Sequence, residues 1–98
     1  MTIYKRAEIT SFIDQHYTPS RKEYFNILLL TDPVARKYSD FLADKKINYI
    51  FDKAVFFLNN YHANNSPLDL VQLCACLHNL QIKTTTYQIE DLGELASI

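Results

Sequence analysis

The stretch Ile47–Leu58, INYIFDKAVFFL, decides the fold of this chain. Its apolar side chains recur at the three- and four-residue spacing of an α-helix and cover a wide arc of that helix. They are Ile47, Ile50, Phe51, Ala54, Val55, Phe57 and Leu58, with Phe56 added. A helix with so wide an apolar arc is expected to contact neighbours on most of its sides. We therefore expect this segment to be the central helix of a helical core.

Three prolines mark where other helices begin on either side of this segment, and the chain contains a single glycine. Each proline follows a residue that suits a helix N-cap, in the pairs Thr18-Pro19, Asp32-Pro33 and Ser66-Pro67. Proline at the first helical position costs no hydrogen bond, because the N–H that it lacks would have had no partner there. The sequence therefore predicts helix starts at these three points.

Apolar spacing predicts three helices before the central segment. They run from about Lys5 to His16, from Pro19 or Ser20 to about Leu30, and from Pro33 to a break near Asp44–Lys46. In the second of them, Ser20 and Glu23 have the spacing of a capping box. The side chains expected to be buried are, in chain order, Ile9, Phe12, Ile13 and Tyr17; Tyr24, Ile27 and Leu28; and Val34, Tyr38, Phe41 and Leu42.

The segment after the central helix is predicted to be a loop over His62–Ser66, because asparagine and serine there favour side-chain bonds to the backbone. A fifth helix then begins at Ser66-Pro67. Its expected apolar face consists of Leu70, Leu73, Leu77 and Leu80 beside Val71 and Cys74.

The segment Ile82–Ile89 has two interpretations. Its three consecutive threonines and Tyr87 suit a strand, for which Thr2–Lys5 is the available partner. Alternatively, a cap at Thr85 or Thr86 begins a last helix, and we prefer this interpretation. The expected fold is a single all-α domain over residues 1–98, a compact bundle of about five to six short helices, with a minor β-pair as the alternative at its end.

Composition agrees with a folded globular domain, because 48% of the residues are hydrophobic and 21% are charged. No apolar run approaches the roughly 18 residues of a membrane span. Charges near Met1 are unlike a secretory signal, and the two cysteines are two positions apart on one predicted helix, where they diverge. We therefore expect a cytoplasmic protein with reduced thiols and no membrane partner.

No set of residues in the sequence predicts catalysis. Cys74 and His78 share a helical face, but two ligands do not make a zinc site, and Cys74 is expected to be buried among leucines. The acidic residues Glu90, Asp91 and Glu94 suit the first turns of a terminal helix better than general acid or base chemistry. We expect no enzyme activity, no metal and no cofactor.

Aromatic and basic residues point to a binding function instead. Phe25, Tyr49, Phe56 and Tyr61 cannot all point inward alongside their neighbours, and tyrosine with arginine is enriched at protein interfaces. Nine of the ten lysines and arginines precede Ala54, which leaves the remainder of the chain acidic. The candidate partner-binding residues are those of the third helix and the following turn: Arg36, Lys37, Tyr38, Lys45, Lys46 and Tyr49.

We therefore expect a small non-catalytic intracellular regulatory or adaptor protein that binds another protein, in an inhibitor, antitoxin-like or immunity-like role, with a homodimer as a further expectation. The alternative is a nucleic-acid-binding regulator that uses the dibasic pairs and tyrosines of the N-terminal half. Interleaved acidic residues make this alternative the weaker one, because they indicate a solvated, ion-paired surface.

Overall fold

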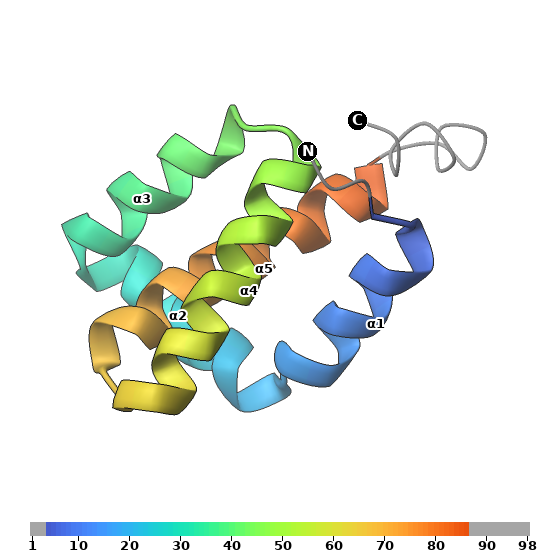
Figure 1. The fold of residues 1–98 in the computed structure, drawn as a ribbon. Coiled ribbons are helices and arrows are strands. Elements are labelled where there is room, and N and C mark those ends of the chain that lie inside the picture. The colour runs from blue at the N-terminus through green and yellow to red at the C-terminus, as the bar shows by residue number, and fades with distance from the viewer. Residues whose placement is uncertain (1–3, 87–98) are drawn as a thin grey trace.

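The computed structural model describes residues 4–86, which form five α-helices and contain no strand (Figure 1). The helices are α1 (Arg6–His16), α2 (Pro19–Thr31), α3 (Pro33–Ala43), α4 (Ile47–Asn64) and α5 (Pro67–Thr86). The predicted all-α bundle is confirmed. None of the helices in this part of the chain is long and apolar enough to cross a lipid bilayer.

Helix starts lie where the prolines predict them. The Thr18 side chain accepts a hydrogen bond from the backbone N–H of Arg21, 3.3 Å away, and caps α2. The Asp32 carboxylate accepts one from the N–H of Val34 at 2.9 Å and caps α3. The predicted capping box at Ser20 is wrong, because Pro19 occupies the first helical position and so places the cap one residue before it.

Helix α5 is the hub of the bundle, since it packs against each of the other four helices. Five consecutive residues, Leu73–Leu77, are fully buried, so this part of α5 is covered on every side. Helix α4 makes its largest contact with α5 and buries the apolar residues predicted for it, apart from half-buried Val55 and exposed Phe56. The central position expected for α4 therefore belongs to α5.

Two boundaries near the end of the chain differ from expectation. Helix α4 continues through His62 to Asn64 and ends where Asn65 adopts a left-handed conformation, with φ of 54° and ψ of 33°. Asparagine tolerates this conformation better than most residues, so the loop is shorter than predicted. Helix α5 is continuous through Thr86, so Ile82–Thr86 is neither a strand nor a new helix start. The remaining residues of the predicted strand pair and last helix, 87–89 and 2–3, lie outside the described residues.

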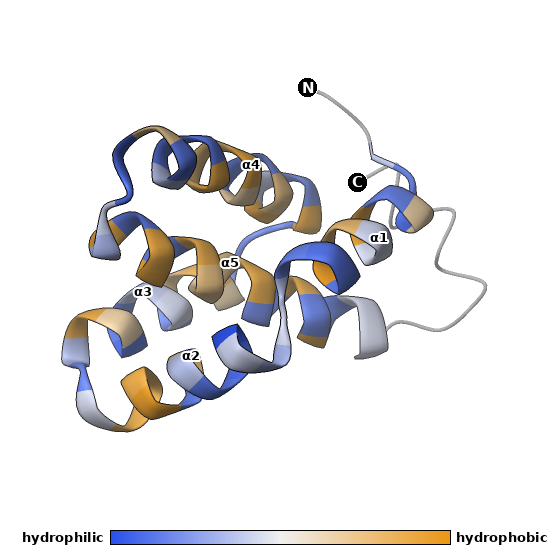
Figure 2. Ribbon diagram, turned by 90° about the horizontal axis from the view of Figure 1, so that it is seen from below, coloured by the Kyte–Doolittle hydropathy of each residue, from blue (hydrophilic) through white to orange (hydrophobic). Residues whose placement is uncertain are grey.

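The inward faces of α2 and α3 also differ from the predicted ones. Phe25 is fully buried in α2, whereas Ile27 is exposed. In α3 the buried residues are Ala35, Ser39 and Leu42, while Val34 and Phe41 are exposed. Figure 2 shows hydrophobic residues along α4 and α5, and more of them where α2 leads into α3 at the edge of the bundle.

Candidate functional site

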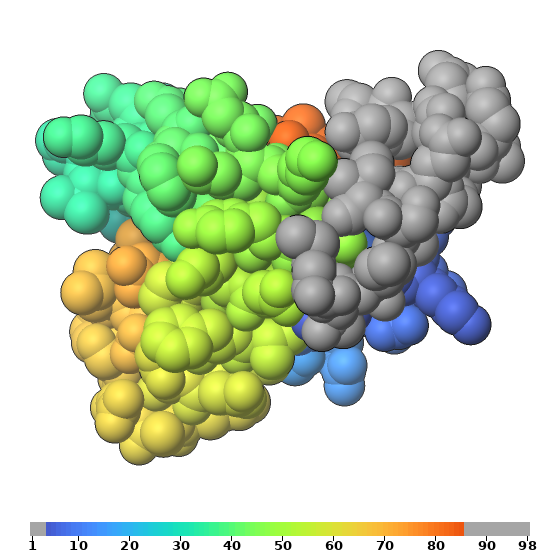
Figure 3. All heavy atoms as spheres, turned by 45° about the horizontal axis from the view of Figure 1, so that its top comes forward, coloured from blue at the N-terminus to red at the C-terminus, as the bar shows by residue number. Residues whose placement is uncertain are grey.

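Small side chains place α3 against α5. Ala35 and Ser39 are buried on the inward face of α3, and their size lets the two helices approach closely. The Asn79 amide of α5 donates to the backbone oxygen of Ser39 at 3.3 Å, to its hydroxyl at 3.2 Å and to the backbone oxygen of Ala75 at 2.9 Å. This rotation of α3 leaves its larger apolar residues Val34 and Phe41 exposed. Figure 3 shows α3 and α4 next to each other on one side of the molecule.

Side chains of α3, α4 and the turn between them form a closed circuit of ring contacts on this side. We call it the aromatic–lysine face and define it as Tyr38, Phe41, Lys45, Tyr49, Lys53, Phe56 and Phe57. Phe41 is 48% exposed, Tyr49 38% and Phe56 54%. Three large aromatic rings therefore remain open to solvent on adjoining helices.

Two lysines connect the exposed rings. Lys45 Nζ lies 4.5 Å from the ring centroid of Phe41 and 5.7 Å from that of Tyr49. Lys53 Nζ lies 5.5 Å from the centroid of Tyr49 and 5.8 Å from that of Phe56. Each ammonium group thus lies between two rings, within the distance at which cation–π attraction is significant.

Ring-to-ring contacts complete the circuit. The ring of buried Phe57 lies 5.3 Å from that of Phe56 and meets the ring of Tyr38 edge-on at 6.0 Å. Tyr38 in turn stacks on Phe41 at 6.0 Å. Tyr38 is half-buried and packs against the hydrophobic core, and burial raises the pKa of its hydroxyl. Tyr38 and Phe57 therefore fix the base of the face to the core.

The structure brings together most of the residues predicted for partner binding. Tyr38, Lys45 and Tyr49 belong to the aromatic–lysine face, and Lys37 lines a shallow apolar groove of about 260 Å³ beside it, together with Val34, Tyr38 and Phe41. Lys46 is exposed at the N-cap of α4. Lys37, Tyr38, Lys45 and Tyr49 therefore lie on one surface, and Lys46 follows Lys45 in the chain.

Arg36, which was also predicted to bind the partner, stabilises the turn between α2 and α3. Its Nε donates to the backbone oxygen of Leu29 at 3.0 Å, and its second guanidinium nitrogen donates to that of Leu30 at 3.3 Å. The last carbonyls of a helix lack intrahelical donors, so this side chain satisfies two of them at the end of α2. Replacing Arg36 would therefore disturb the α2–α3 turn, and it is a poor probe of binding.

Four members of the face were not predicted as site residues: Phe41, Lys53, Phe56 and Phe57. Phe56 stood out only as an aromatic residue that could not point inward together with its neighbours, and it is indeed exposed. Positions 41, 45, 49, 53 and 57 are each four residues apart and carry Phe, Lys, Tyr, Lys and Phe. This alternation of aromatic and basic residues across a helix break is the signal from which the face could have been found.

The cysteine and histidine pair of α5 lies in the core. Cys74 and Cys76 are fully buried, and His78 packs its ring 5.5 Å from that of Phe25. Burial raises the pKa of Cys74 to about 11 and that of Cys76 to about 12, and it lowers the pKa of His78. Within residues 4–86, no three histidine, cysteine, aspartate or glutamate side chains are grouped as metal ligands would be.

Both thiols are expected to be unreactive in the folded protein, because a buried thiol with a raised pKa forms little of the nucleophilic thiolate at neutral pH. Titration with Ellman's reagent should detect almost no thiol in the native state and two per chain in denaturant. Rapid reaction of either thiol in the native protein would contradict the buried position of α5.

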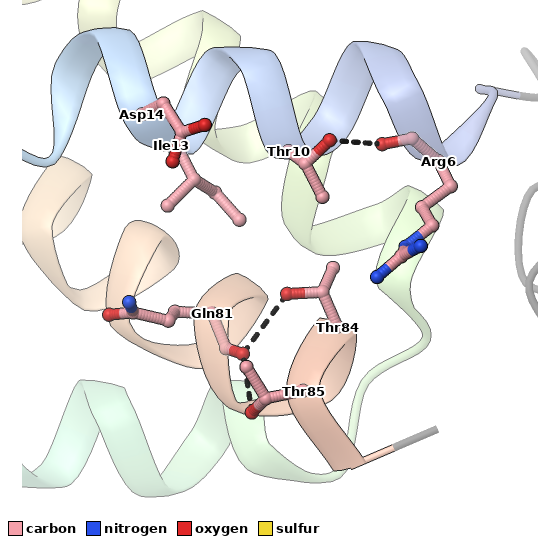
Figure 4. A pocket seen from close by; sticks show the side chains of 7 residues that line it. All are labelled: Arg6, Thr10, Ile13, Asp14, Gln81, Thr84 and Thr85. Carbon is pink, nitrogen blue, oxygen red and sulfur yellow. Dashed lines mark hydrogen bonds between the residues drawn. The ribbon is translucent and has the colours of Figure 1, made fainter. Parts of the chain in front are cut away.

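A cavity of about 400 Å³ lies between α1 and the end of α5 (Figure 4). The hydroxyls of its threonines donate to backbone oxygens of their own helices, so they are not free to donate to a ligand. The remaining polar groups come from Arg6, Asp14 and Gln81. Its lining residues are Arg6, Thr10, Ile13, Asp14, Gln81, Thr84 and Thr85.

These features give the aromatic–lysine face the clearest functional character in the described part of the chain. Comparison with known proteins adds no further assignment: the chain matches no protein-family model, no curated protein and no solved structure.

Proposed function

We propose that this protein is a small non-catalytic regulatory or adaptor protein that binds another protein through the aromatic–lysine face. The observation that carries the proposal is the circuit of exposed rings held in place by Lys45 and Lys53. Aromatic side chains supply a large contact area at a low cost in conformational entropy, and they dominate the energetic centres of protein interfaces. A surface restrained before binding loses less freedom on association.

Charge indicates the chemistry of the partner. Lys45 and Lys53 lie over the exposed rings and Lys37 lines the groove beside Phe41, so a fitting surface presents carboxylates between apolar side chains. The same contacts resemble those of single-strand nucleic-acid binders, where bases stack on rings beside basic groups. Exposed Asp40 on α3 and Asp44 in the following turn give this part of the chain charges of both signs, whereas nucleic-acid binders usually present a clearly basic surface. We further propose that the protein acts in the cytoplasm, in an inhibitor, antitoxin-like or immunity-like role.

The decisive test replaces Phe41 and Phe56 by serine in one chain. The partner is first captured from a lysate of the source organism, identified, purified and titrated against the wild-type protein. We expect the double variant to bind it at least about tenfold more weakly, because truncating a central aromatic residue typically costs more than 1 kcal/mol of binding energy. Helical circular dichroism should remain that of the wild type, because both side chains are exposed.

The matched control is the double variant Ile27→Ser with Leu68→Ser, whose side chains are 53% and 56% exposed but lie outside the face. It should bind the purified partner like the wild type. Equal affinity of the wild type and the Phe41 and Phe56 double variant would overturn the proposal. Salt-sensitive retention of single-stranded DNA, lost on replacing Lys45 and Lys53 by glutamine, would favour the nucleic-acid function instead.

A further inference from the structure

The last twelve residues, 87–98, have the composition that the aromatic–lysine face requires of an occupant. They contain Glu90, Asp91 and Glu94, and they contain no lysine or arginine. Ile89, Leu92 and Leu95 alternate with these acids. We call residues 87–98 the acidic segment; they lie outside the described residues.

The last turn of α5, after which the acidic segment follows in the sequence, lies near one end of the face. Lys83, in the last turn of α5, donates from Nζ to the backbone oxygen of Ala43 at 3.0 Å. Ala43 is the last residue of α3, two positions before Lys45. The end of α5 is therefore held against the turn that joins α3 to α4, and Figure 1 shows the two at the same end of the molecule.

The acidic segment is long enough to cover the face. Twelve residues span at most about 40 Å. Tyr49 and Phe56 are seven residues apart on α4, which corresponds to roughly 10 Å along the helix axis. A segment tethered this close to its binding surface has an effective concentration of the order of millimolar, so even weak contacts keep the surface occupied.

We infer that the acidic segment of the same chain binds the aromatic–lysine face, with its carboxylates beside Lys45 and Lys53 and its aliphatic side chains against the exposed rings. This inference rests on the proposed function, because it assigns an internal competitor to the surface that binds the partner. A partner must displace the segment, so its apparent affinity is lowered by the fraction of chains in which the face is covered.

A spin label at position 97 of the chain tests this placement. Because Cys74 and Cys76 are buried, the substitution Ser97→Cys provides the reactive thiol. In nitrogen-15 spectra, the label should broaden the amide signals of Lys45, Tyr49 and Lys53, and it should leave those of Leu68 and Asp69 unaffected. Leu68 and Asp69 lie at the opposite end of α5.

Charge variants show whether the contact is specific. Replacing Glu90, Asp91 and Glu94 by Gln, Asn and Gln, or Lys45 and Lys53 by glutamine, should each abolish the broadening on the face, and so should high salt. The matched control Lys5→Gln with Lys22→Gln should retain it. Neutralising the three acids should also tighten partner binding by at least about twofold.

Three results would overturn the inference. The first is broadening confined to Thr10 and Asp14, which would place the segment in the cavity between α1 and α5. The second is broadening of the face only between spin-labelled and nitrogen-15-labelled chains mixed together, which would identify a second copy as the occupant. The third is no broadening of the face at all. None of these results would change the expected effect of Phe41→Ser with Phe56→Ser on partner binding. The inference can therefore be wrong while the proposed function is right, and the experiments distinguish the two cases.

Discussion

Replacing Phe25 by alanine is expected to lower the free energy of unfolding by about 3–5 kcal/mol. The Phe25 side chain is fully buried in α2, and its ring packs against that of His78 on the hub helix α5. Its removal leaves a cavity that the surrounding helices fill only in part. Small domains are stable by about 5–15 kcal/mol in total, so much of the cooperative stability should be lost.

Urea denaturation followed by circular dichroism measures this effect, and Phe56→Ala is the matched control. Phe56 has the same side chain, but it is 54% exposed on the aromatic–lysine face. Its replacement should cost less than about 1 kcal/mol, as is usual for surface positions. Equal losses for the two variants would mean that α2 does not pack on α5 through Phe25.

Replacing Asn48 by leucine is expected to raise the free energy of unfolding by about 1–3 kcal/mol. Asn48 is fully buried near the start of α4, and neither its amide nitrogen nor its amide oxygen has a hydrogen-bond partner. Burying an unpaired amide carries a desolvation cost that nothing offsets. Leucine has nearly the same shape and removes that cost, so the thermal and urea midpoints should both rise.

The other buried asparagine of this part of the chain provides the contrast. Asn79 donates to three oxygens, two of them on Ser39 of α3, so Asn79→Leu should destabilise the protein by about 1–3 kcal/mol. The same substitution thus has opposite signs at two buried positions. A loss of stability in Asn48→Leu would show that its amide is satisfied by a bound water molecule.

Features set by local chemistry were predictable from the sequence. Asp32-Pro33 determines a helix start through the dihedral angles of proline and the acceptor of the preceding side chain, whatever the helix later contacts. The break near Asp44–Lys46 was equally visible, because continuing the apolar face of α3 would have buried charged residues. Both predictions are confirmed.

The rotation of each helix was harder to predict, because it depends on the neighbouring helix. Hydrophobicity alone favours Val34 and Phe41 as the buried residues of α3. The structure buries Ala35 and Ser39 instead, since small residues allow the close approach to α5 and the hydrogen bonds from Asn79. No property of α3 by itself reveals that requirement.

The same limit explains why the candidate site was predicted in part. Lys45 and Tyr49 were identified from their charge and surplus aromatic character. Phe41 was missed because it had been assigned to the core, and Lys53 was missed because its significance lies in the two rings beside it. Which residues form a surface shared by two helices depends on how each helix is rotated about its axis. A wrong prediction of that rotation therefore gives a wrong prediction of the site residues.

The position of the hub helix also bears on how the protein is made. Ribosomes synthesise α1 to α4 first, and the helix that each of them packs against leaves the exit tunnel after them. Until then, the apolar faces of four helices have no shared surface to cover them. Newly made chains should therefore depend on rapid completion of translation, or on chaperones that shield those faces, because exposed apolar surface in incomplete chains promotes aggregation.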